Sequence, residues 1–201
     1  MHGTSISKDR CSVQPLTVFF RALLIVCQVT FGTGAPGVPQ RIGNSMNVAI
    51  PVHSRTGNTR SVADRMQQTL ESAGHAVRII DVRTTGGSGQ EPGETVFDGV
   101  TTLSGYDGII FGSPVHAFSL APDMEAFMKV LPPLEGKTVA CFVTQAFPFP
   151  WMGGTRAVRQ MAKLCRARGA TVSGTGVVNW GRTCREKLIR RAVEKITSVF
   201  R

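Results

Sequence analysis

The chain has 201 residues, and its 23 lysines and arginines outnumber 13 acidic residues, giving a formal net charge of +10. With 42% hydrophobic and 18% charged residues, it can bury a core, which excludes a wholly disordered or collagen-like chain. Five cysteines are too few for a small disulfide scaffold, and none stands in the C-x-x-C spacing of a zinc ribbon or an iron–sulfur centre.

Residues 1–45 differ from the rest, and we expect the folded domain to comprise residues 46–201. The apolar stretch 16–31 is interrupted by Arg21 and Gln28, so no membrane span of about 20 apolar residues is expected. Basic residues, an apolar centre and small residues follow one another as in a secretory signal. A disordered tail, or a start codon assigned too early with Met46 as the native start, is favoured over a signal. The expected location is cytoplasmic, or exported or membrane-associated if the signal is genuine.

From residue 47 onward, short apolar runs alternate with amphipathic stretches. Strands are predicted at 47–52, 75–82, 108–112, 137–144 and 171–178. Helical spacing of apolar residues predicts helices that end near Gly74, 131, Gly169 and 200. The weak pattern of 84–103 leaves the second crossover open. Helices between consecutive strands imply right-handed crossovers and a parallel sheet. The predicted fold class is α/β, a three-layer α/β/α sandwich around a five-stranded parallel sheet.

A polar turn between the first strand and the first helix has the composition of a phosphate site. Gly57 allows close approach of the backbone, and the first N–H groups of the helix point at the same spot. The turn lacks the lysine of a nucleoside triphosphate loop and the G-x-G-x-x-G of a dinucleotide loop. It predicts a site for a phosphate monoester. Its residues are Ser54, Arg55, Thr56, Gly57, Asn58 and Thr59.

This strand–[ST]-x-T-G-N-T–helix arrangement resembles the flavodoxins and flavodoxin-like flavoproteins, over about residues 47–200. The resemblance implies the strand order 2-1-3-4-5 and FMN as the cofactor, with its 5′-phosphate in the Ser54–Thr59 loop. It also places the ligand at the carboxyl ends of the strands, near the point where the strand order reverses.

Two further loops fall where the family places its contacts to the flavin ring. The candidates after the third strand are Ser113, Pro114, Val115, His116, Ala117 and Phe118, and those after the fourth are Thr144, Gln145, Phe147, Trp151 and Gly153. Phe118, Phe147 or Trp151 would contact the ring, unless these side chains only pack within the protein. His116 would contact the ring, or is a polar loop residue without chemistry.

The charge of this chain departs from that of electron-carrying flavodoxins, which are typically acidic. Residues 1–45 contain four of the 23 basic residues and one of the 13 acidic ones, which leaves +7 for residues 46–201. This charge suits an acidic partner or solvated helix faces. Nucleic acid is not expected as a partner, and a homo-oligomer stays open.

The leading interpretation is an FMN-binding redox protein that uses NAD(P)H to reduce quinones or similar small acceptors. One alternative is an electron carrier between protein partners, without a small-molecule substrate of its own. The other is a flavin-free binding protein on the same fold. No catalytic acid–base residue is expected, because the cofactor would supply the chemistry. The four histidines have no metal-ligand spacing, so no metal site is expected.

Overall fold

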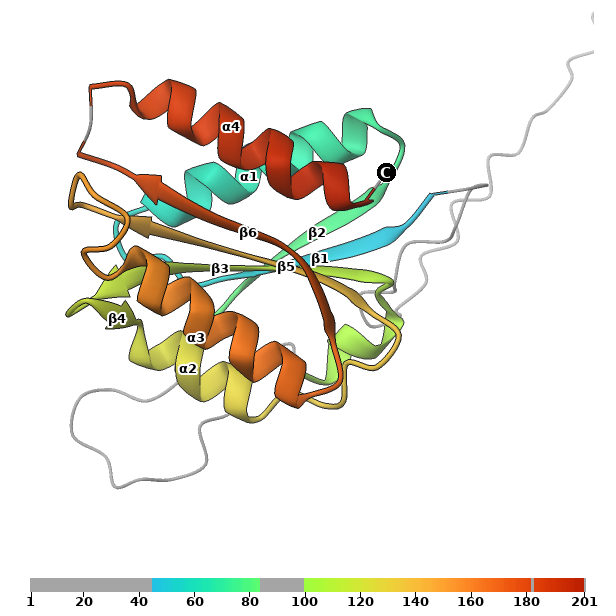
Figure 1. The fold of residues 1–201 in the computed structure, drawn as a ribbon. Helices are drawn as coiled ribbons and strands as arrows, with labels where there is room; N and C mark the ends of the chain where they lie inside the picture. The colour runs from blue at the N-terminus through green and yellow to red at the C-terminus, as the bar shows by residue number, and fades with distance from the viewer. Residues whose placement is uncertain (1–44, 84–99, 182, 201) are drawn as a thin grey trace, which may run out of the picture. The chain divides into compact units, whose positions relative to one another are not determined.

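The computed structural model describes residues 45–83, 100–181 and 183–200 (Figure 1). The predictions for residues 1–44, and most of those for the second crossover, lie outside these ranges.

The strands form one sheet with the order β2-β1-β3-β5-β6, and β4 pairs with β3 outside this row. Every neighbouring pair in the row is parallel, whereas β3 and β4 are antiparallel. The predicted parallel sheet and its order are therefore confirmed, with β4 as a short strand that the sequence pattern did not indicate. The strands are β1 (Asn47–Val52), β2 (Ala76–Asp81), β3 (Gly108–His116), β4 (Ser119–Leu120), β5 (Thr138–Gln145) and β6 (Thr171–Asn179).

Helices cover both faces of the sheet, with α1 and α4 on one side and α2 and α3 on the other (Figure 1). They are α1 (Asn58–Ser72), α2 (Pro122–Lys129), α3 (Gly154–Ala167) and α4 (Arg185–Thr197), with short 3₁₀ turns at Val100–Gly105 and Ser198–Phe200. In α1 the buried residues Val62, Met66 and Leu70 follow one another at intervals of four, so they lie on one face of the helix. None of these helices is long and apolar enough to cross a membrane.

The core is divided in two by the central strands, because successive side chains of a strand point to opposite faces. In β3, Ile109 and Phe111 belong to the cluster beneath α2 and α3, whereas Ile110 belongs to the cluster beneath α1 and α4. All three are fully buried. Such near-continuous apolar strands are typical of a parallel sheet covered on both faces.

The topology brings the carboxyl ends of β1, β3 and β5 to one edge of the sheet. The strand order reverses between β1 and β3, since β1 leads outward to β2 and β3 leads outward to β5. Ligands of open α/β sheets bind at such a reversal, outside the carboxyl ends of the strands. The predicted phosphate loop follows β1 directly at this point.

Candidate functional site

The loop after β1 forms the N-terminal end of α1 and leaves amide groups free for an anion. Gly57 precedes the helix with φ +81°, a left-handed conformation that favours glycine. The amide of Arg60 donates to Ser54 Oγ at 3.3 Å, and the amide of Ser61 donates to Gly57 O at 2.8 Å. The amides of Asn58 and Thr59 have no acceptor within the helix, so they can donate to a phosphate at the positive end of the helix dipole.

A buried hydrogen bond ties this loop to the end of β5. The hydroxyl oxygens of Thr59 and Thr144 lie 2.8 Å apart, and both side chains are buried. The bond fixes the first turn of α1 against a strand 85 residues further along the chain. The two segments that a ligand would touch are thereby held at a constant separation.

A pocket of about 460 Å³ opens beside this bond. Its volume falls within the range of about 300–1,000 Å³ that is typical of small-molecule sites. Many of the predicted site residues line it: Arg55, Thr56, Asn58, Thr59, Pro114, Val115, His116, Thr144 and Gln145. The structure thus brings together the phosphate loop and the starts of both predicted ring loops.

The pocket also contains residues that sequence reasoning missed: His53, Ala121, Pro122, Asp123, Ala146 and Trp180. His53 Nδ1 lies 3.0 Å from Val82 O, and its Nε2 lies 3.4 Å from a carboxylate oxygen of Asp123. Asp123 is brought there by β4, which turns the chain back before α2. Trp180 directly follows β6, whose carboxyl end lies at the same edge of the sheet. Its position after a strand was the signal that could have identified it.

The charge available for a phosphate comes from Arg55 rather than from Arg60. The Arg60 guanidinium bonds Asp64 and Asp81 at 2.9 Å, and the hydrogen bond to Asp64 is the largest cause of its raised pKa. Two carboxylates therefore compensate this charge. Arg55 is exposed, lines the pocket and has no ion-pair partner among the residues of the described ranges.

The remaining predicted site residues do not line the pocket: Ser54, Gly57, Ser113, Ala117, Phe118, Phe147, Trp151 and Gly153. Ser54 and Gly57 shape the phosphate loop from outside. Ser113 is buried, and its hydroxyl donates to Pro114 O at 3.0 Å. Ala117 and Phe118 form the turn between β3 and β4.

Four exposed aromatic rings lie on the loops beside the pocket, and we call them the aromatic cluster: Phe118, Phe147, Phe149 and Trp151. Phe118 stacks on Phe147 with ring centroids 5.1 Å apart, and Phe149 stacks on Trp151 at 4.5 Å. Trp151 is the most exposed, at 72%. Phe147 and Trp151, which were expected to contact a flavin, therefore contact other rings in this structure.

Hydrogen bonds from Gln145 hold the loop that carries most of this cluster. The amide nitrogen of Gln145 donates to Phe147 O at 3.0 Å and to Phe149 O at 2.6 Å. The side chain itself is buried at the end of β5. The loop is thus fixed by a residue that also lines the pocket.

The lining of the pocket combines two kinds of chemistry, and both fit FMN. Amides, hydroxyl groups and Arg55 of the loop after β1 could bind a phosphate. Pro114, Val115, Ala146 and Trp180, which lie on the loops after other strands, provide apolar surface against which a flat ring system could be buried.

Residues 48–183 match the family model described as NADPH-dependent FMN reductase. No curated protein is significantly similar to the chain. Solved structures with a similar fold include flavodoxin 2 of Bacillus cereus (22% identity, 76% of this chain and 99% of that chain, TM-score 0.57) and a flavodoxin, WrbA-like protein of Agrobacterium tumefaciens (17%, 77% and 97%, 0.56). The flavodoxin of Streptococcus pneumonia TIGR4 is also similar (17%, 75% and 97%, 0.56).

At identities below 25%, these likenesses establish the fold and no more. The family match covers more than half of the chain, and it agrees with the fold and with a pocket that begins at the phosphate loop. The chain therefore belongs to the NADPH-dependent FMN reductase family, as a flavodoxin-like redox protein whose cofactor is FMN.

Proposed function

We propose that this protein is an oxidoreductase that takes electrons from NAD(P)H and passes them, through its FMN, to quinones or similar small acceptors. The observation that carries the proposal is the 460 Å³ pocket, whose lining joins polar residues of the phosphate loop to apolar residues such as Val115 and Trp180. The family model is described as NADPH-dependent, which supports NAD(P)H as the proposed electron source.

In this proposal the chain binds and orients the cofactor from both ends. Thr56, Asn58 and Thr59 hold the phosphate together with Arg55, while the backbone at Val115 and His116 borders the ring. FMN supplies the redox chemistry when bound, by accepting and releasing one or two electrons. The protein's share is to anchor the phosphate and to exclude bulk water from the ring.

His53 is placed to fix one wall of the site. Its Nδ1 lies 3.0 Å from the carbonyl oxygen of Val82, and its Nε2 lies 3.4 Å from a carboxylate oxygen of Asp123. The ring therefore lies between the end of β1 and the start of α2, at one wall of the pocket.

The aromatic cluster favours a second candidate function, that of an electron carrier between proteins. Exposed aromatic side chains beside a cofactor pocket are typical of surfaces that bind other proteins. With the basic charge of the domain, they would suit an acidic partner. This carrier would have no small-molecule substrate of its own.

A visible absorption spectrum of the purified full-length chain, recorded with added FMN and then NADPH, tests both functions. Flavin bands that persist through desalting are expected. Bleaching by NADPH, and recovery of the bands on adding a quinone, support the reductase. Bands that NADPH leaves intact but that a reduced protein donor bleaches support the carrier. An FMN affinity weaker than about 1 mM, or about −4 kcal/mol, would contradict both.

Riboflavin, which lacks the phosphate, tests the orientation of the cofactor. Thr56→Val and Arg55→Ala are expected to weaken FMN binding about tenfold or more, since hydrogen bonds to charged groups contribute about 1.5–3 kcal/mol. Riboflavin binding should change less than twofold. Thr69→Val, further along α1, is the matched control. Equal losses for both flavins would contradict the proposed position of the phosphate.

A further inference from the structure

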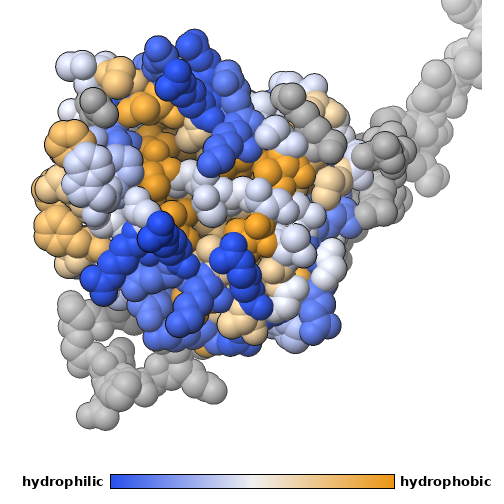
Figure 2. Space-filling model, viewed as in Figure 1, coloured by the Kyte–Doolittle hydropathy of each residue, from blue (hydrophilic) through white to orange (hydrophobic). Residues whose placement is uncertain are grey.

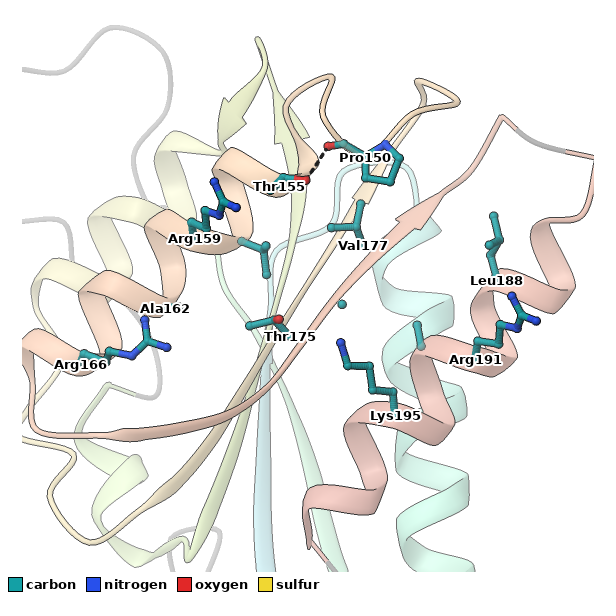
Figure 3. A pocket seen from close by; sticks show the side chains of 13 residues that line it. Pro150, Thr155, Arg159, Ala162, Arg166, Thr175, Val177, Leu188, Arg191 and Lys195 are labelled. Carbon is teal, nitrogen blue, oxygen red and sulfur yellow. Dashed lines mark hydrogen bonds between the residues drawn. The ribbon is translucent and has the colours of Figure 1, made fainter.

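We propose that the outer edge of β6 is a docking site for an extended acidic segment of a partner protein. A groove of about 590 Å³ runs along this edge between α3 and α4. Figure 3 shows its two walls, with Arg159 and Arg166 on α3 and Arg191 and Lys195 on α4, on either side of Thr175 and Val177 of β6. We call it the β6 groove.

The groove gives access to unpaired backbone. β6 ends the row of strands and pairs only with β5 in the part of the chain that the structure describes. Thr175, Gly176 and Val177 lie at the bottom of the groove. An edge strand presents a row of free N–H and C=O groups, which an extended peptide can pair with by adding a strand.

Cations surround the groove without carboxylates to neutralise them. Arg159, Arg166, Arg191 and Lys195 are all exposed, and no acidic residue lines the groove. Within the described ranges, none of the four has an ion-pair partner. Like charges that face one another across a groove concentrate a positive potential, which attracts acidic groups. In Figure 2, which is coloured by hydropathy, a white and orange band lies between two groups of blue, hydrophilic residues, where β6 runs between α3 and α4 in Figure 1.

Apolar side chains also line the walls of the groove. Val158 and Ala162 of α3 and Leu188 and Ala192 of α4 line the groove on its two sides. Side chains of a strand alternate between its two faces. A peptide that pairs with β6 would therefore direct successive side chains toward α3 and toward α4. Because cations and apolar side chains line both helices, a segment in which pairs of acidic residues alternate with pairs of small apolar residues presents both kinds of side chain to each wall of the groove.

Two other occupants suit the groove less well. Residues 1–45 of the chain carry four basic residues and one acidic residue, so their charge has the same sign as the rim. A single-stranded nucleic acid would engage the cations, but it would leave the strand edge unused. It would also find no aromatic ring among the lining residues for its bases to stack on.

The test uses the full-length chain and a fluorescently labelled ten-residue peptide in which pairs of glutamates alternate with pairs of valines. Fluorescence anisotropy should show saturable binding, and a lysine–valine peptide of equal length should not bind. The double variant Arg159→Glu/Lys195→Glu is expected to weaken binding tenfold or more, because like charges are costly at an interface. Arg83→Glu is the matched control: this exposed residue follows β2, at the opposite edge of the sheet. It should change the affinity less than twofold.

Amide hydrogen exchange then separates strand addition from simple charge attraction. Exchange in β6 should slow when the peptide binds, whereas exchange in β2 should not change. Absence of saturable binding would overturn the proposal. So would equal weakening by Arg83→Glu, unchanged exchange in β6, or displacement of the peptide by a lower concentration of an oligonucleotide of equal charge. Because the groove contains no residue of the FMN pocket, these results do not depend on flavin binding.

Discussion

A Cβ atom on Gly153 would lie 2.7 Å from the Cα atom of Phe118. The loop between β5 and α3 therefore touches the turn between β3 and β4 backbone to backbone. Ala117 and Phe118 both have left-handed φ angles, 45° and 60°, as the central residues of a tight hairpin turn do. Residues without glycine's freedom adopt this conformation only where surrounding contacts impose it. The backbone contact between Gly153 and Phe118 is one such contact. It holds the hairpin of β3 and β4, and the end of β3 lines the pocket.

Gly153→Ala should separate these loops and destabilise the protein. We expect the free energy of unfolding to fall by about 2–4 kcal/mol, because the new methyl group meets backbone and φ at this position is +103°. Gly136→Ala is the control, with φ +72° and nothing within 4 Å of the added atom, and it should cost about 1 kcal/mol. Urea unfolding measures both. Equal losses would show that the loop contact contributes nothing.

This hairpin also shows where the sequence pattern stopped being informative. The prediction ended the third strand at Gly112, since Ser113 and Pro114 read as the start of a loop. In the structure β3 continues to His116, because its end pairs with β5 on one side and with β4 on the other. Where a strand ends depends on its pairing with segments distant in the sequence, and the local sequence pattern does not encode that pairing. β1, β3 and β5 were predictable because each is mainly a buried apolar run between turn signals. β2 and β6 are only partly buried, and the pattern indicated them less directly.

The bond between Thr59 and Thr144 should stabilise both the fold and the cofactor site. Thr59→Val leaves the buried hydroxyl of Thr144 without this partner, which should cost about 1–3 kcal/mol of unfolding free energy. FMN affinity should fall as well, because the first turn of α1 loses its attachment to β5. Isothermal titration with FMN and urea unfolding measure the two effects.

The double variant Thr59→Val/Thr144→Val isolates this bond. Replacing both hydroxyl groups should cost less than the sum of the single variants, since no buried polar group is then left unpaired. Thr69→Val in the same helix is the control, because its hydroxyl bonds only Arg65 O on the exposed side. Strict additivity in the cycle would contradict a direct interaction between the two threonines.

The two tryptophans are expected to differ in their effect on FMN. Trp180 lines the pocket, and the Arg185 guanidinium lies over its ring at 4.9 Å from the centroid. Trp180→Ala should weaken FMN binding about five- to tenfold, which corresponds to about 1–1.4 kcal/mol of aromatic contact. Trp151→Ala should change it less than twofold. Titration monitored by flavin fluorescence measures both affinities. A larger loss of FMN affinity for Trp151→Ala than for Trp180→Ala would show that the loop after β5 moves over the pocket.

The interpretation of Trp151 as a flavin contact rested on its position after the fourth strand of the row. Gln145 and Ala146 of the same loop line the pocket. The ring of Trp151 stacks on Phe149 in this structure, and its contact with a flavin stays a prediction. A sequence motif can predict which backbone borders a pocket, as Arg55, Thr56, Asn58 and Thr59 of the Ser54–Thr59 loop do. The orientation of side chains in a long proline-rich loop depends on contacts that only the folded structure shows.

A buried thiol pair links β5 to α3 and predicts a pH dependence of stability. The sulfur atoms of Cys141 and Cys165 lie 4.0 Å apart. The hydrogen bond between the two thiols, together with burial, raises the pKa of the Cys141 thiol. The folded chain therefore keeps this proton at a pH where the unfolded chain loses it. Above the unfolded thiol's pKa of about 8.5, the free energy of unfolding should fall as the pH rises.

Cys141→Ala should remove this contribution, which is at most about 1.4 kcal/mol per pH unit for one thiol. Urea unfolding under reducing conditions at pH 7, 8.5 and 9.5 measures the slope in the parent chain and in the variant. The variant should lose stability less steeply above pH 8.5, even though its stability at pH 7 is lowered by the missing sulfur. Cys184→Ala is the control, because this thiol is exposed in the folded chain and its removal should leave the slope unchanged. Identical slopes in all three proteins would show that the Cys141 proton does not contribute to stability.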